Sequence, residues 1–453
     1  MGAGIAGLSA AWRMLRLGFG DFVALEMEKR PGGNSRSGQN SASAYPWGAH
    51  YVPVPDHRIP LVEELFSELG VLKNGRWNGA HLAREPLSRL FRDGSWRPGI
   101  EPGESAPQSE RDQFDRFWDR MDYFRKGGEF TIPIREPGAT TGLDTLSMKA
   151  WMVQEGFFHE RLRWYADYAC RDDYGCSYDE ASAWAGIHYF AARPANDVGY
   201  LTWPEGNGWI VERLVERVGP RLRTGMPVRH VRKAGGHLEV VTPRSVLQCE
   251  AVIFAAPTFL AGYLMPFLAA ELPGRSRLQY SPWYTANLTV DREPREPDAP
   301  PAWENILYDS PGLGYVIATH QSGSASHSPS VWTYYRALTR PHPSQARTSL
   351  LTTSWEERKE EVLRDLETAH PDIRECVSRV DIMRLAHAMI RPVPGLLTSG
   401  ALRRLADGSG TVQFANSDLS GISIFEEAQF RGVRAADRVL TRLGYRDLEY
   451  AEA

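Results

Sequence analysis

A glycine-rich turn at the start of the chain constrains its fold more than any other feature. Gly2, Gly4 and Gly7 match the G-x-G-x-x-G pattern of dinucleotide-binding turns, and apolar residues at helical spacing follow them. In such a turn the first glycine permits a tight bend, the second lets the backbone approach a pyrophosphate, and the third lets a helix pack close to a sheet. The helix would begin at Ile5 and Ala6 and point its amides at the phosphates. The pattern therefore predicts a doubly wound α/β domain with a dinucleotide cofactor.

The turn lacks the strand that normally leads into it. An apolar run should precede Gly2, and only Met1 stands there. We therefore expect either that the first strand of the fold is missing from this chain or that it lies upstream. A leader for export to the periplasm would lie in the same upstream segment; without one, the expected location is the cytoplasm.

Residues after the turn narrow the choice of cofactor. Residues 22–25 have the composition of a second buried strand, which ends at Glu26, about twenty residues after the glycines. A carboxylate at this place accepts hydrogen bonds from a ribose diol and disfavours a 2′-phosphate. Gly32 and Gly33 then form a turn suited to close contact between backbone and cofactor. The segment predicts a dinucleotide whose ribose carries no phosphate at the 2′ position.

These motifs together resemble the FAD-binding signature of flavin-containing amine oxidases, phytoene desaturases and protoporphyrinogen oxidases. Four later blocks are similar to that family in order and spacing: residues 46–51, 203–228, 251–257 and 412–421. The resemblance implies that the first block passes the flavin ring and that the backbone of Val228 meets the adenine. It also implies that Asp418 reaches the ribityl-phosphate region and that a helix start behind it faces the flavin.

The resemblance also indicates how FAD is held. Asn34 replaces the arginine usual after the paired glycines, so we expect Arg36 to supply that positive charge. Residues 377–415 contain no cysteine of the kind that attaches FAD in some members, so we predict non-covalent FAD; a histidyl link through His50 or His387 is the alternative. The predicted cofactor-binding residues are Gly2, Gly4, Ile5, Ala6, Gly7, Glu26, Gly32, Gly33, Asn34, Arg36, Gly48, Ala49, His50, Val228, Ala256, Asp418, Gly421, Ile422 and Ser423.

The cofactor motifs are interleaved with other segments along the chain. We expect a discontinuous FAD-binding domain made of residues 1–85, 200–265 and 385–445. Residues 86–199 and 266–384 would then form a mixed α+β substrate-binding domain. Its first segment has mainly helical patterns, and its second has β-rich runs between Pro, Gly and Ser clusters, which predict an antiparallel sheet.

Composition excludes several functional classes. The net charge of −4, without a cluster of basic residues, gives no case for nucleic acid as a partner. No run of about eighteen apolar residues predicts a membrane-spanning helix. The four cysteines lack metal-ligand spacing, so we expect no metal site. These properties suit an enzyme that acts on a small molecule.

Candidate catalytic residues come from blocks that we expect to meet at the domain junction, because a flavin carries the chemistry and the protein orients the substrate. They are Trp47, His50, His188 and Tyr284. Further aromatic candidates for the pocket are Tyr51, Trp184, Tyr189, Trp283, Tyr334 and Tyr335. Packing in the core is the alternative for each of these side chains. Asp172 and Asp173 could bind a cationic substrate, with a solvated loop as the alternative.

Two departures from the amine oxidase pattern bear on the substrate. Many members carry a lysine on the strand that corresponds to residues 284–288, where this chain has Ala286 at about that place. Members with an aromatic cage have a tyrosine before the last helix, where residues 423–425 are Ser-Ile-Phe. We expect an FAD-dependent oxidoreductase that moves a hydride from a C–N bond of an amine, such as a polyamine, to flavin N5, with oxygen or another acceptor reoxidising the flavin. The alternatives are a desaturase-like dehydrogenase with a long apolar tunnel and a non-catalytic FAD-binding protein.

Overall fold

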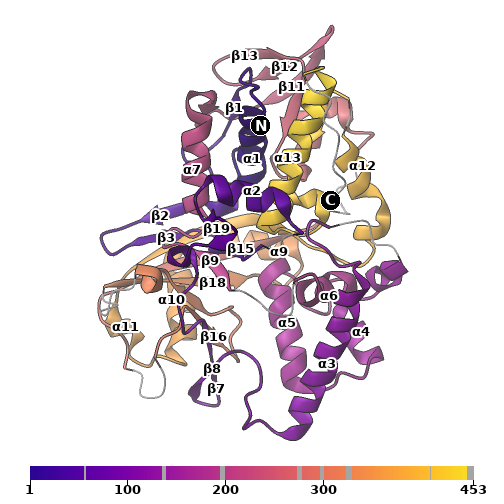
Figure 1. Cartoon of the computed structure of the whole chain (residues 1–453). Coiled ribbons are helices and arrows are strands. Elements are labelled where there is room, and N and C mark those ends of the chain that lie inside the picture. The colour runs from indigo at the N-terminus through magenta and orange to yellow at the C-terminus, as the bar shows by residue number, and fades with distance from the viewer. Residues whose placement is uncertain are drawn as a thin grey trace.

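The computed structural model describes residues 1–55, 58–134, 139–193, 199–272, 278–295, 300–322, 329–408 and 410–445. Figure 1 shows the N-terminal helix α1 (Ile5–Arg16) and the C-terminal helix α13 (Phe425–Arg442) side by side in the upper part, beneath a sheet that runs from β11 (His230–Ala234) to β13 (Val246–Cys249). A larger sheet that includes β15 (Tyr280–Val290), β18 (Ser330–Ala337) and β19 (Val377–Ile390) lies below them. The helices from α3 (Gln108–Gly127) to α6 (Ala183–Ala191) occupy the lower right. The two ends of the sequence therefore meet in one part of the molecule.

A small parallel sheet holds the glycine turn in the upper part. Its strands are β1 (Ala24–Leu25), β10 (Leu222–Arg223), β14 (Val252–Phe254) and β20 (Val412–Phe414). A separate antiparallel sheet consists of β11 (His230–Ala234), β12 (His237–Val241) and β13 (Val246–Cys249). β1 pairs in parallel with β10, and β14 pairs in parallel with β20. Between these pairs, the Gly2 amide donates to the Leu25 carbonyl and the Ala255 amide donates to the Met1 carbonyl, both at 2.8 Å. The first residues of the chain thus take the central position that the sequence led us to assign to a missing strand.

Helices cover this sheet and bring two helix starts together. They are α1 (Ile5–Arg16), α2 (Pro60–Glu68), α7 (Gly208–Val218), α8 (Ala261–Leu264), α12 (Ala401–Asp407) and α13 (Phe425–Arg442). α1 buries Leu8 and Trp12, and α13 buries Val433 and Leu440, at the spacing of one helical face. A Cβ atom on Gly432 of α13 would overlap a backbone carbonyl of α1, so only glycine permits this approach. The N-termini of both helices consequently point in the same direction, toward the centre of the molecule (Figure 1).

The largest sheet has seven strands in the order β19-β15-β18-β17-β16-β7-β8. Their bounds are β7 (Ser88–Arg92), β8 (Ser95–Pro98), β15 (Tyr280–Val290), β16 (Glu304–Leu307), β17 (Tyr315–Ile317), β18 (Ser330–Ala337) and β19 (Val377–Ile390). The β-rich runs expected in the second insertion form β15–β18, and their mutual pairings are antiparallel. β16 also pairs in parallel with β7, which links the two insertions through one sheet. The boundary expected at residue 385 falls inside β19.

Helices α9 (Pro343–Thr352), α10 (Trp355–Glu367) and α11 (Ile373–Cys376) accompany the large sheet. The first insertion is helical as expected and forms α3 (Gln108–Gly127), α4 (Met148–Gln154), α5 (Glu160–Tyr174) and α6 (Ala183–Ala191). Shorter paired strands are β2 (Ser37–Gln39) with β3 (Ala44–Pro46), β4 (Tyr51–Pro53) with β9 (Tyr200–Thr202), and β5 (Leu72–Lys73) with β6 (Arg76–Trp77). Within the described residues, the model contains no helix that is both long and apolar enough to cross a membrane.

Candidate active site

A cavity of about 880 Å³ connects the glycine turns with the helices of the first insertion. At one end its walls include Gly4, Gly33 and Asp418, and at the other they include Glu101 and Trp118. Between these ends, the large sheet contributes Trp283, Thr285 and Tyr335 to the wall. Helix α5 contributes Asp172 and Asp173, and helix α6 contributes Tyr189. One continuous space thus borders both the predicted cofactor site and the segments predicted to hold substrate.

The glycine turn fits a dinucleotide, because protein backbone leaves no room for a side chain at Gly2 and Gly7 but leaves space at Gly4. A Cβ atom on Gly2 would lie 2.8 Å from the Ala255 carbonyl oxygen, and one on Gly7 would overlap the Gly2 carbonyl. These two positions are closed by the protein's own backbone. A Cβ atom on Gly4 would meet no protein atom nearer than 3.9 Å and would project beside the cavity that Gly4 lines. The space at Gly4 is therefore kept open for something other than protein, as close approach of a pyrophosphate requires.

Two helix starts open into the same cavity. Ile5 and Ala6 at the start of α1, and Ile424 and Phe425 at the start of α13, line its wall. Neither helix has a side-chain hydrogen bond at its N-cap. Their first amides and the positive ends of their dipoles are available to negative groups. The start of α1 suits a phosphate. The start of α13 suits a flavin ring, which gains negative charge when it is reduced.

Two acidic residues predicted to bind the cofactor have distinct surroundings. The Glu26 carboxylate accepts hydrogen bonds from the Ala3 amide at 2.8 Å and the Glu28 amide at 2.9 Å, which fixes the strand end beside the turn. Asp418 lines the cavity, and its Oδ2 atom accepts from the Thr258 amide at 2.8 Å and from the Tyr280 hydroxyl at 2.6 Å. Burial raises the pKa of Asp418. Both donors contact one oxygen, so they set the direction in which the other oxygen points.

Replacing Tyr280 with phenylalanine should weaken FAD binding about tenfold, the usual effect of one hydrogen bond to a charged group. The ring packing of Tyr280 against Phe259 would remain, and only the donor that orients Asp418 would be lost. Quenching of flavin fluorescence during titration of apoprotein measures the affinity. Tyr123→Phe, at a side chain that is 64% exposed, is the matched control. Equal FAD affinity in both variants would contradict this role.

The other predicted cofactor residues divide into two groups. Those that line the cavity are Gly4, Ile5, Ala6, Gly32, Gly33, Asn34, Gly48, Ala49, His50, Asp418 and Ser423. Those outside its lining are Gly2, Gly7, Glu26, Arg36, Val228, Ala256, Gly421 and Ile422. Arg36 donates from Nε to the Gly33 carbonyl at 3.0 Å, and the Asn34 amide donates to the Ala388 carbonyl at 2.5 Å. The loop that carries the paired glycines is therefore held by its own side chains against β19.

Three of the four candidate catalytic side chains lie away from the cavity. Trp47 packs edge-on against Tyr45. His188 places Nε2 3.0 Å from the Thr131 carbonyl oxygen and stacks on Trp184, and burial lowers its pKa to about 4. Tyr284 lies on the opposite face of β15, with its hydroxyl 3.4 Å from Glu361. The positions of Trp47, His188 and Tyr284 suit packing in the core, the alternative that the sequence left open for each of them.

His50 is the candidate that lines the cavity, and its ring is enclosed by aromatic neighbours. It lies 4.8 Å from the Tyr51 ring and 4.9 Å from the Tyr335 ring, centre to centre. Burial lowers the pKa of His50 to about 3. The imidazole is therefore neutral at physiological pH and shapes the cavity wall without carrying charge.

Alternation along β15 decides which of its side chains can meet a substrate. Trp283 and Thr285 line the cavity, and Thr285 also donates to the Trp47 carbonyl at 3.1 Å. Tyr284 and Ala286 point to the other face, into the apolar cluster that includes Leu363 of α10. Thr285, and not Ala286, is thus the side chain that this strand turns toward the cavity. Sequence spacing alone left this register uncertain by one residue.

Asp172 and Asp173 lie in the last turn of α5, and both carboxylates line the cavity. Among the described residues, none donates a hydrogen bond to either carboxylate. Burial, then the nearby Glu304, raises the pKa of Asp172 to about 7; burial, then Asp172 itself, raises the pKa of Asp173 to about 8. The C-terminal end of a helix is also where negative charge is least favourable. The two carboxyl groups thus lie on a helix at the cavity wall, where their ionised forms are unfavourable, and not in a solvated loop.

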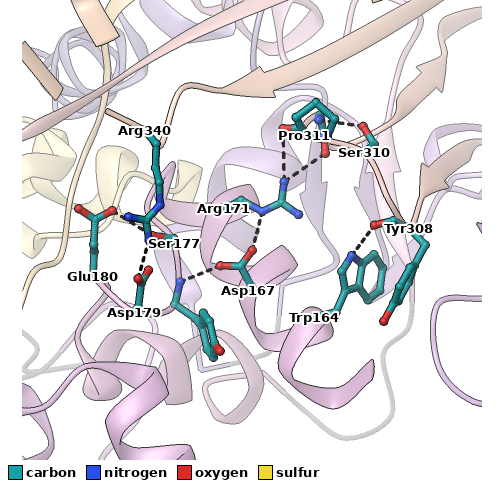
Figure 2. Close-up of polar contacts among 12 residues, drawn as sticks. Trp164, Asp167, Arg171, Ser177, Asp179, Glu180, Tyr308, Ser310, Pro311 and Arg340 are labelled. Carbon is teal, nitrogen blue, oxygen red and sulfur yellow. Dashed lines mark hydrogen bonds and ion pairs between the residues drawn. The ribbon is translucent and has the colours of Figure 1, made fainter. Parts of the chain in front are cut away.

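The arginines near this pair are committed to other partners. Figure 2 shows the contacts of the Arg171 guanidinium, which donates to Asp167 at 2.9 Å and to the carbonyl of Pro311 at 3.4 Å, and neither acceptor lines the cavity. Arg193 lines the cavity and pairs with Glu426 at 2.9 Å. Arg125, which also lines it, pairs with Asp122. Since these lining cations are each paired with another acid, they leave the negative charge that Asp172 and Asp173 carry when ionised without a dedicated partner among the described residues.

Several cavity residues had no signal strong enough to single them out in the sequence. Of the aromatic candidates, Tyr51, Tyr189, Trp283 and Tyr335 line the cavity, and the others do not. Thr285, Glu101 and Trp118 were not considered, because each stands alone between motifs and meets the cavity only through tertiary packing. His387 lines the cavity, stacked 4.3 Å from Phe259, and burial lowers its pKa to about 4.

Comparison with known proteins places this arrangement in context. The sequence matches the family described as flavin containing amine oxidoreductase over residues 5–440. No curated protein matches the sequence. Wild-type putrescine oxidase bound to putrescine has a similar structure, with a TM-score of 0.70 at 17% identity over 97% of this chain and 98% of its own.

Two further solved structures are similar to this chain. Cyclohexylamine oxidase from Brevibacterium oxydans IH-35A gives a TM-score of 0.72 at 16% identity over 98% of each chain. A CLA-producing fatty acid isomerase from P. acnes gives 0.69 at 15% identity over 97% of each chain. Proteins with quite different substrates therefore share this fold, and the substrate has to be inferred from the cavity itself.

Proposed function

This chain belongs to the flavin-containing amine oxidoreductase family, and we propose that it oxidises a C–N bond of an amine with non-covalently bound FAD. The observation that carries the proposal is the pair of carboxyl groups of Asp172 and Asp173, which accept no hydrogen bond from the described residues and line the cavity that begins at the glycine turn. A protonated amine supplies the positive charge that these carboxylates lack. An apolar substrate would leave both of them buried without a partner.

The roles of this chain's residues follow from their positions. When bound, FAD supplies the hydride acceptor. The open backbone at Gly4 and the start of α1 would hold the pyrophosphate, and Asp418 would meet the ribityl-phosphate region. Thr285, Tyr335 and the neutral His50 would form the wall against which the substrate carbon is placed. No cysteine is among the residues that line the cavity, whereas His50 and His387 both line it, so a histidyl link is the alternative to non-covalent binding.

Different segments of the chain would bind the cofactor and the substrate. Residues 1–85, 200–265 and 385–445 would hold FAD, and the two insertions would hold the substrate. Putrescine oxidase and cyclohexylamine oxidase are named after amines, and the fatty acid isomerase is named after an apolar acid. The acidic wall supports the first class, and a desaturase-like reaction on an apolar skeleton is the second candidate.

Anaerobic mixing of the FAD-loaded protein with separate panels of amines and apolar alkenes tests the proposal. We expect amines alone to bleach the flavin absorbance, with colour restored by air or by another acceptor. Bleaching by the apolar panel alone would establish the second candidate. A flavin that no compound in either panel reduces would support a non-catalytic role.

Substrate capture should strengthen as the pH rises through 7 and 8, the values to which burial raises the pKa of Asp172 and Asp173. A carboxylate with a raised pKa is neutral below that value and anionic above it, so its attraction for an ammonium group is lost as the pH falls. His50 and His188, with pKa values of about 3 and about 4, contribute no change in this range. The dependence of kcat/KM on pH measures the effect.

The Asp172→Asn variant provides the control for that profile. Asp172 is the like charge that helps to raise the pKa of Asp173, so removing it should shift the rising limb to lower pH. A profile that is identical in the wild type, in Asp172→Asn and in Asp173→Asn would assign the limb to the substrate or the flavin instead.

A further inference from the structure

We propose that the outer end of the cavity, formed by Glu101, Trp118 and Tyr165, binds a second positive charge of the substrate, which is therefore a linear polyamine with at least three nitrogens. The inference rests on the proposed amine oxidation. One nitrogen would belong to the C–N bond that is oxidised. A second would face Asp172 and Asp173, and a third would reach Glu101.

The outer carboxylate is held in place by two aromatic donors. Glu101 follows β8, and it is solvent-exposed while also lining the cavity, so it stands at the mouth. Trp118 of α3 donates from Nε1 to Glu101 Oε2 at 3.1 Å, and the Tyr165 hydroxyl of α5 donates to Oε1 at 3.2 Å. Both rings line the cavity beside the carboxylate. A carboxylate with aromatic rings next to it is an arrangement that attracts an ammonium group by charge and by cation–π contact.

Two arginines in this part of the molecule, Arg161 and Arg125, form their ion pairs with acids other than Glu101. Arg161 pairs with Glu110 at 2.8 Å and donates to the Ile100 carbonyl at 3.1 Å, so its guanidinium is occupied. Arg125 pairs with Asp122 and donates to the Phe190 carbonyl at 3.0 Å. Glu101 is exposed as a residue, but its carboxylate is partly enclosed by the two rings; this burial raises the pKa of Glu101, while its two aromatic hydrogen bonds and Arg161 oppose the rise. A bound cation would favour the ionised carboxylate in the same way as those hydrogen bonds.

Helix geometry sets the distance between the outer and inner acidic positions. Tyr165, which holds Glu101, and Asp172 are seven residues apart on α5, which places them on the same face, about 10 Å apart along the helix axis. Both residues line the cavity, and Tyr189 of the neighbouring helix lines it as well. Helix α6, which carries Tyr189, packs against α5, so this ring lines the cavity next to the helix that carries Tyr165 and Asp172.

This alternation of acidic and aromatic walls defines the substrate class. Ammonium groups of the substrate would bind at Glu101 and at the pair Asp172 and Asp173. The methylene chain that joins them would pack against the ring of Tyr189. A four-carbon diamine that places one nitrogen at the site of oxidation is too short to reach both acidic positions. A linear triamine or tetramine has enough charges and enough length to reach from the site of oxidation to Glu101 in the part of the cavity that FAD leaves free.

Flavin reduction under anaerobic conditions by spermidine, putrescine and hexylamine, in the wild type and in Glu101→Gln, tests the inference. Because Glu101 is remote from the reacting bond, we expect its replacement to raise the apparent dissociation constant for spermidine about tenfold, the worth of one partly exposed cation site, without changing the limiting rate. The constants for putrescine and hexylamine should stay unchanged. The difference between substrates is the readout, since a loss of folding would affect all three.

Asp119→Asn is the matched control, because Asp119 is an exposed acid of α3 next to Trp118 that does not line the cavity. It should leave all three constants unchanged. If Glu101→Gln weakens all three amines equally, or none of them, the outer site is refuted while amine oxidation stands. If no amine reduces the wild-type flavin, the proposed function itself fails.

Discussion

Replacing Gly7 with alanine should destabilise the protein even without a cofactor, whereas replacing Gly4 with alanine should weaken only cofactor binding. A Cβ atom at Gly7 would overlap the Gly2 carbonyl, so the helix would have to move off the turn. We expect the free energy of unfolding of the apoprotein to fall by about 3 kcal/mol, as for overpacking against rigid backbone. Denaturant unfolding of apoprotein measures it.

Gly4 is the comparison that separates folding from binding. Its φ of −78° suits alanine, and its Cβ atom would meet no protein atom nearer than 3.9 Å. The unfolding free energy of apo Gly4→Ala should therefore stay within about 0.5 kcal/mol of the wild type. Its affinity for FAD should fall about 100-fold, because a methyl group would fill the space kept for the pyrophosphate. Full FAD affinity in Gly4→Ala would show that the cofactor does not approach this backbone.

Replacing Asp172 with asparagine should raise KM for amine substrates on the order of 100-fold, the cost of removing one partner from an enclosed charge pair. The change preserves shape and removes the charge. Asp173→Asn should have a smaller effect, because Asp173 lies near Arg193 and Glu426, which already form an ion pair. Steady-state kinetics with one good amine substrate measure both variants.

The matched control for this pair is Glu160→Gln, at the exposed start of the same helix. It removes a carboxylate from α5 without touching the cavity, and KM should not change. A larger effect from Asp173→Asn than from Asp172→Asn would contradict the assignment of the substrate cation to Asp172. Equal and small effects would mean that the cation binds elsewhere in the cavity.

The cofactor region could be predicted from the sequence because its chemistry is local. A glycine turn, a strand that ends in an acid and a second glycine pair each specify a backbone path within a few residues. Gly4, Gly33 and Asp418 were therefore identified and do line the cavity. The exception is the central strand, whose position is taken by Met1 and Gly2 through backbone hydrogen bonds that no side-chain pattern records.

The substrate region could be predicted only in part, because its chemistry depends on tertiary packing. Tyr284 and His188 have the right residue types, but strand alternation and helix packing turn them into the core. Asp172 and Asp173 stand out in the sequence as a pair, yet their importance depends on the pairing of the nearby Arg171 and Arg193 with other acids, which only the structure reveals. Glu101 and Trp118 meet across two separate segments, and neither stands in a recognisable motif.

Stopped-flow measurement of flavin reduction by an amine, with hydrogen or deuterium on the carbon next to nitrogen, tests the central claim most directly. If the enzyme breaks this C–H bond and passes a hydride to the flavin, we expect reduction to be clearly slower with the deuterated amine. The isotope effect should persist in Asp172→Asn at saturating amine, because that residue binds charge and does not meet the reacting bond. A flavin that no amine reduces, while an apolar substrate does, would contradict the account.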